Sequence, residues 1–90
     1  MRPVELAIDV TSPEHPYVQL ADQLRARIQS GEITDVFPSL WTIVEETHFA
    51  GDPDRRVAYN TARRAVKILK DEGLVVAIPG RGTFVKRDAG

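Results

Sequence analysis

Residues 69–85 read LKDEGLVVAIPGRGTFV, and this stretch decides the fold. Gly73 stops a helical pattern, and Leu74–Ile78 follows as an apolar run rich in β-branched residues. Pro79-Gly80-Arg81-Gly82 is turn chemistry, after which Thr83–Lys86 resumes a strand pattern. The stretch therefore predicts a helix that leads into a β-hairpin with a glycine-rich, positively charged tip.

The segment before this hairpin has the periodicity of an amphipathic helix. Its apolar residues recur at i, i+4, i+7, i+8 and i+11, namely Ala58, Ala62, Ala65, Val66 and Leu69. Asp52-Pro53 has N-cap and first-turn chemistry, so the helix is expected to begin there or a few residues later. We predict it over about residues 55–72.

Two further helices are predicted upstream of this one. The first spans residues 16–30 and ends at Gly31. Its apolar stripe consists of Tyr17, Leu20, Ala21, Leu24 and Ile28. Ser39 is a suitable N-cap for the second helix, whose apolar side consists of Leu40, Ile43 and Val44. Trp41 lies off that side or at its edge, and we expect it to cover a neighbouring part of the core rather than bind a ligand.

The order of elements predicts the fold class. Val4–Val10 alternates apolar and polar residues, as a half-buried strand does. Strand, helix, helix, helix and hairpin together make a mainly α fold with a small β-hairpin, the winged helix-turn-helix. We expect one domain over residues 1–90, with its core at about 3–87. In the helix-turn-helix mode the last helix lies in the major groove of DNA.

The charge of the chain is distributed unevenly. Residues 55–90 carry nine basic residues and three acids, a net charge of +6, whereas residues 1–54 carry three basic residues and ten acids, a net charge of −7. A one-sided basic region is typical of proteins that bind a duplex, although most charge runs are merely solvated surface. The side chains between the charges are needed to decide.

The third helix and the hairpin carry side chains suited to DNA. Asn60 can pair with adenine, and Arg63 or Arg64 with guanine. Tyr59 and Thr61 can reach phosphates or thymine methyl groups. The residues better suited to phosphates are Arg55, Arg56, Lys67 and Lys70. Arg81 stands between two glycines at the hairpin tip, where it can enter a minor groove, although an ordinary tight turn has the same composition.

Catalysis, metal binding and membrane insertion find little support. The sequence has no cysteine, and His15 and His48 lack metal-ligand spacing, so we expect no metal site and no cofactor. Its serines have no nearby histidine or acid pattern for nucleophilic catalysis, and we expect no enzymatic activity. The apolar runs are far shorter than the roughly 20 residues that span a bilayer, so a cytoplasmic protein is expected.

Most of the chain, about residues 3–87, resembles the DNA-binding domain of GntR-type bacterial transcription regulators. The segments that carry the resemblance are Pro16–Ile28 with Ser30-Gly31, Pro38-Ser39, Asn60–Ala65, Leu69–Val75 and Gly80–Val85. The resemblance implies that the third helix contacts the major groove and that the wing, residues 79–83, touches the minor groove. It also implies DNA contacts by Ser39, Thr61 and Arg63, with Gly82 and Arg81 at the wing.

Three features depart from the family pattern. Leu40-Trp41 replaces a Glu-Arg pair whose arginine binds a phosphate in the family, so that contact is expected to be lost. Ala58-Tyr59 replaces a Ser-Arg pair, so the base preference should differ. The connection between the second and third helices is longer than usual, and we expect Arg55 and Arg56 in it to replace the missing charge.

The expected function is sequence-specific binding of double-stranded DNA by a transcription regulator, which we expect to be a repressor. A homodimer on an inverted repeat is expected because one helix and one wing cover only a half-site. The strand near the N-terminus or the acidic half could supply the dimer contact. The chain ends after the wing, so no effector site is expected in these residues. The alternative is a winged-helix module that binds proteins, which the acidic N-terminal half and the pI of about 6.1 would suit.

Overall fold

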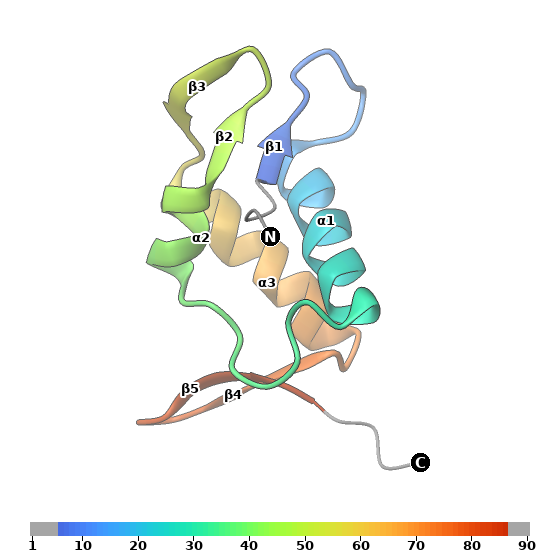
Figure 1. The fold of residues 1–90 in the computed structure, drawn as a ribbon, viewed down its shortest axis with the longest axis vertical. Coiled ribbons are helices and arrows are strands. Elements are labelled where there is room, and N and C mark those ends of the chain that lie inside the picture. The colour runs from blue at the N-terminus through green and yellow to red at the C-terminus, as the bar shows by residue number, and fades with distance from the viewer. Residues whose placement is uncertain (1–5, 87–90) are drawn as a thin grey trace.

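A computed structural model describes residues 6–86, except for the side chain of residue 53. The elements are β1 (Leu6–Ile8), α1 (Pro16–Ser30), α2 (Leu40–Glu46), β2 (Thr47–Phe49), β3 (Asp52–Arg56), α3 (Tyr59–Asp71), β4 (Val75–Ile78) and β5 (Gly82–Val85). Figure 1 shows the β1–β2–β3 sheet at the top and the β4–β5 hairpin at the bottom, with α1 and α2 on either side of α3. The predicted winged helix-turn-helix is confirmed, with a second small sheet added to it.

The helix ends follow the capping residues in the sequence. α1 spans the predicted residues 16–30, and the backbone N–H of its αL cap Gly31 (φ 88°) donates to the Arg27 and Ile28 carbonyls. At the start of α2, the Ser39 hydroxyl accepts a hydrogen bond of 3.1 Å from the Thr42 N–H. Gly73 (φ 80°) follows the end of α3, as predicted.

The predicted start of the third helix is wrong. Asp52–Arg56 forms β3 instead of a first helical turn, and α3 begins at Tyr59. Ala58, predicted to be buried, is the exposed N-cap of α3, while Val57 beside it is buried. The reason is non-local: β2 pairs with β3 in an antiparallel hairpin and with β1 in parallel. Burial of Phe49 and Val57 fixes this hairpin against the core.

The N-terminal strand is shorter than predicted where it can be compared. β1 spans Leu6–Ile8, and Val10 is 60 % exposed, while residues 4 and 5 lie outside the described residues. The strand is followed by Asp9, whose carboxylate accepts hydrogen bonds from the hydroxyl and the N–H of Thr11. These two bonds lower the pKa of Asp9.

Two glutamines of α1 occupy the side of β1 that β2 leaves open. The Gln23 amide accepts from the Ala7 N–H (3.1 Å) and donates to the Ala7 carbonyl (2.6 Å). The Gln19 amide bonds Asp9 in the same two ways, at 2.8 Å and 3.0 Å. These backbone groups are therefore satisfied within the chain and are not open to another strand.

The core lies where α1, α3 and the sheets meet. Leu20 and Leu24 of α1 and Leu69 of α3 are fully buried, and Ala62 and Ala65 of α3 are equally inaccessible. Because alanine adds almost no bulk, α3 can lie close to its neighbours. The solvent-facing side of α3 is thereby fixed in orientation.

The wing is anchored by the loop between α1 and α2. The Phe37 N–H donates to the Thr83 carbonyl and the Val85 N–H donates to the Asp35 carbonyl, each at 2.8 Å. Residues 35–37 thus run antiparallel beside β5, which pairs with β4 on its other side. The position of the wing relative to α3 therefore depends on backbone hydrogen bonds as well as on the Gly73 turn.

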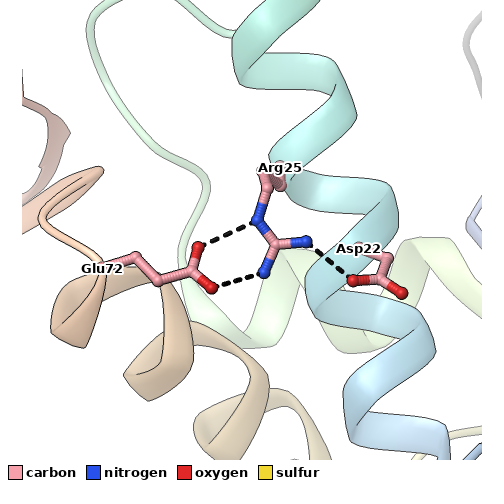
Figure 2. A network of polar contacts seen from close by, with 3 residues as sticks. All are labelled: Asp22, Arg25 and Glu72. Carbon is pink, nitrogen blue, oxygen red and sulfur yellow. Dashed lines mark hydrogen bonds and ion pairs between the residues drawn. The ribbon is translucent and has the colours of Figure 1, made fainter.

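A network of charged side chains joins α1 to the C-terminal end of α3. Figure 2 shows the Arg25 guanidinium bonded to both oxygens of Glu72 (2.8 and 2.7 Å) and to Asp22 (2.7 Å). The hydrogen bonds that Arg25 donates to Glu72 and Asp22 hold its pKa above its usual range. Because the raised pKa belongs to a cation, the protonation of Arg25 contributes its full stabilisation at neutral pH, and this contribution is lost as the pH rises into the strongly alkaline range.

Replacement of Glu72 by glutamine is expected to lower the free energy of unfolding by about 0.2–1 kcal/mol, because the pair is bidentate but partly exposed. Urea denaturation at low and high salt measures it, and the difference should shrink as salt rises. Asp71→Asn is the matched control: it removes an acid from the same helix end, but its bond to Lys67 is fully at the surface. An equal loss in both variants would contradict the role of the Arg25 network.

Candidate nucleic-acid interface

The solvent-facing side of α3 gathers the predicted base contacts. Successive residues of a helix are about 100° apart, so residues three and four apart are neighbours. Arg63 is therefore beside both Tyr59 and Asn60, and Lys67 and Lys70 continue the same side toward the C-terminus. All five side chains are exposed. The opposite side of the helix carries the buried Ala62, Ala65, Val66 and Leu69.

The predicted contacts Thr61 and Arg64 lie on a different flank, next to α1. The Arg64 guanidinium carbon is 4.1 Å from the centre of the Tyr17 ring, a cation–π contact. Tyr17 in turn stacks on His15, with ring centres 5.7 Å apart. Thr61 is half-buried and about 100° around the helix from Asn60. Arg63 and Arg64 are thus both within one turn of Asn60, but the Arg64 guanidinium is drawn toward α1 by the Tyr17 ring.

The α2 flank differs from the prediction. Trp41 does not cover the core: its side chain is 63 % exposed and lies against Tyr59, with ring centres 4.6 Å apart and planes tilted by 39°. Tyr59 is itself 37 % exposed. The displacement of Trp41 from the apolar side of α2 was the available sequence signal. Its partner Tyr59 comes from another helix, so helical spacing around Trp41 does not predict this contact.

Arg55 and Arg56 belong to β3, in the long connection between α2 and α3, and not to the first turn of a helix over residues 55–72. The Arg55 guanidinium carbon is 4.1 Å from the centre of the Phe49 ring, which holds it against the β2–β3 hairpin. Arg56 lies opposite His48 in the register of that hairpin. Both arginines are exposed, and both precede α3 by only a few residues.

The wing tip has the geometry that the sequence suggested. Gly80 (φ 77°) and Gly82 (φ 113°) adopt backbone conformations that other residues rarely reach. Between them, the Arg81 N–H closes the turn on the Ile78 carbonyl (2.9 Å), and the Arg81 side chain is exposed. A single guanidinium is thus presented on a narrow tip.

Ser39 lies at the start of α2 and caps it. Besides accepting from the Thr42 N–H, its hydroxyl donates to the Thr42 hydroxyl at 3.0 Å. The residue is exposed, and its carbonyl accepts a hydrogen bond from the Ile43 N–H at 3.0 Å. Its first role in the structure is to define the helix end beside Trp41.

Residues 6–86 show neither a metal site nor a membrane-spanning helix. Within that range no group of three His, Asp or Glu side chains could hold a metal ion. None of the helices described there is long and apolar enough to cross a membrane. The exposed side of α3 and the wing tip are where the predicted functional residues concentrate.

Comparison with known proteins gives a consistent set of similarities. Residues of this chain are 32 % identical over 80 positions to the HTH-type transcriptional repressor NagR of Bacillus subtilis (strain 168), a match that covers 89 % of this chain and 30 % of NagR. The chain thus spans about a third of that relative. No family model matches the sequence.

Two solved structures share the fold. A transcriptional antiterminator from Listeria monocytogenes EGD-e superposes with a TM-score of 0.76 at 18 % identity, over 96 % of this chain and 60 % of that one. The AraR DNA-binding domain, solved in complex with operator ORX1, gives a TM-score of 0.68 at 23 % identity, over 93 % of this chain and all (100 %) of that one.

Proposed function

We propose that this chain, which is a winged-helix domain of the GntR type, binds double-stranded DNA in a sequence-specific manner as part of a transcription regulator. The observation that carries the proposal is the solvent-facing side of α3. There Asn60 and Arg63, which can pair with adenine and guanine, lie side by side among basic residues. A core built from the other side of the same helix leaves this side free to enter a groove.

In the proposed complex, α3 enters the major groove and the wing reaches the neighbouring minor groove. Asn60 and Arg63 contact base edges, and Arg81 enters the minor groove where Gly82 allows close approach. Phosphate contacts come from Arg64, Lys67 and Lys70, and from Ser39 and Thr61 at the starts of α2 and α3. Tyr59 completes the N-terminal end of the helical face.

We further propose a cytoplasmic repressor that binds as a homodimer to an inverted repeat. The repressor activity of the similar NagR supports the direction of regulation. Because one α3 and one wing cover a single half-site, two copies are needed for a site of ordinary specificity. Since the Ala7 and Asp9 backbone groups already bond to α1, the acidic N-terminal half is the better candidate for the dimer contact.

A protein-binding module is the second candidate. It is favoured by the acidic N-terminal half, with a net charge of −7 over residues 1–54, which would repel a duplex that approached from that side. The two candidates differ in their response to salt. Phosphate contacts release counterions, so DNA affinity falls steeply as salt rises.

A salt titration of binding to mixed-sequence duplex DNA tests the proposal. Five to six phosphate contacts per domain would give a slope of about −5 in log affinity against log salt. Absence of binding at low salt would exclude DNA as the partner and leave the protein-binding module.

Replacement of Arg55 and Arg56 by alanine is expected to weaken binding to all duplexes alike and to reduce the salt slope by about two, since each arginine is proposed to neutralise one phosphate. The measurement is affinity at several salt concentrations for a selected and a mixed duplex. The control is Asp52→Asn with Asp54→Asn, which removes two acids from the same strand. It changes the net charge by the same amount in the opposite direction and should strengthen binding. Unchanged affinity and slope in the arginine variant would reject a DNA role for β3.

A further inference from the structure

An exposed aromatic pair adjoins the base-contacting side of α3. Trp41 is the second residue of α2 and Tyr59 the first of α3, and their rings are 4.6 Å apart. The Trp41 side chain is 63 % exposed, which is unusual for the largest apolar side chain when no partner covers it. The pair therefore has surface left to bury against a ligand.

The position of the pair relative to Arg63 indicates what that ligand is. Tyr59 and Arg63 are one helical turn apart on the same side of α3, so the pair extends the base-contacting side toward α2. In a helix-turn-helix, the N-terminal residues of the last helix contact base edges, while the preceding helix crosses the DNA backbone. The pair thus lies where the edge of the major groove would be.

The chemistry of the pair favours an apolar group over a phosphate. Neither ring carries a charge, and Glu45 lies one turn after Trp41 on the exposed side of α2, where it would repel a phosphate. The apolar group that the major groove offers is the 5-methyl group of thymine. An aromatic surface can cover that methyl group and remove it from water.

We propose that Trp41 and Tyr59 form a specificity determinant that packs on the methyl group of one thymine in each half-site. The assignment rests on the proposed function, because it requires α3 in the major groove. It gives Trp41 a role in base selection at a position where the wider family pattern has a phosphate-binding arginine. The base preference of this chain should accordingly include a thymine that a basic residue would not require.

The first test uses Trp41 as its own probe, because it is the only tryptophan in the sequence. Its fluorescence is followed while the protein is titrated with a duplex selected from a random pool. We expect the emission to shift to shorter wavelength and the ring to become protected from iodide and acrylamide. Unchanged emission and quenching at saturation would overturn the proposal.

The second test replaces each thymine of the selected duplex by uracil, which lacks the methyl group. We expect one position per half-site to lose about fourfold in affinity with the wild-type protein, the value of one buried methyl group. Trp41→Ala should bind more weakly and lose this sensitivity at that position alone. Trp41→Phe, which keeps a ring, should retain it.

Val10→Ala is the matched control, since it truncates another exposed apolar side chain, 60 % accessible, in the turn after β1. It should keep the wild-type pattern of uracil sensitivity. If Trp41→Ala weakens binding but leaves the uracil effect intact, the pair acts on the fold or the backbone and the proposal is wrong. If the protein binds a selected duplex in a salt-sensitive manner but no thymine of that duplex is sensitive to replacement by uracil, this inference alone is wrong. If the protein binds no duplex at low salt, the proposed function itself is wrong.

Discussion

Replacement of Arg63 by alanine is expected to lower affinity for the selected duplex by about 1–3 kcal/mol, which is about 5- to 150-fold. Arg63 is exposed at the centre of the α3 side that carries Asn60, and it can bond a guanine through two N–H groups. Its loss removes discrimination at one base pair, so the preference at that position should relax. Affinity for single-base variants of the duplex measures both effects.

Arg64→Ala is the matched control for this prediction. It removes the same charge from the next residue of the same helix, but its guanidinium lies over the Tyr17 ring of α1. We expect a smaller loss, equal for all duplexes, as for a phosphate contact. If Arg64→Ala relaxed the base preference and Arg63→Ala did not, the proposed orientation of α3 in the groove would be wrong.

Replacement of Leu69 by alanine is expected to lower the free energy of unfolding by about 2–5 kcal/mol. Leu69 is fully buried in the core near the C-terminal end of α3, and truncation would leave a cavity there. Small domains have total stabilities near the lower end of about 5–15 kcal/mol, so the variant should be partly unfolded at 37 °C. Urea and thermal denaturation followed by circular dichroism measure the change.

Val36→Ala is the control for the core prediction, because Val36 is 68 % exposed. It should change stability by less than about 0.5 kcal/mol. Similar stability of the two variants would mean that Leu69 does not belong to the packed core, and the orientation of α3 would lose its basis.

Local patterns in the sequence predicted the elements that local chemistry determines. The apolar stripe of residues 16–30 and the stop at Gly31 gave α1 its full length. The glycines on either side of Arg81 predicted the tip of the wing, because glycine readily adopts the positive φ angles that this turn requires. Asn60 and Arg63 could be placed together on α3 from helical spacing alone.

The remaining features depend on contacts between distant residues. β2 pairs with β1, some 40 residues earlier, and β3 pairs with β2. Strands this short leave little periodicity to detect. The sequence therefore predicts the start of a helix at Arg55 and Arg56, where the structure has the end of β3. The contact of Trp41 with Tyr59 joins α2 to α3, so the pattern of either helix alone does not predict it. The roles of the individual DNA contacts remain predictions.

Selection of bound sequences from a random duplex pool tests most directly whether the exposed side of α3 binds DNA specifically. We predict an enriched site with two-fold symmetry, in which each half-site contains a guanine for Arg63, an adenine for Asn60 and a thymine near them. Arg63→Ala should lose the guanine preference in the same experiment. A pool that stays random after repeated rounds at low salt, with no retained DNA, would contradict the proposed function.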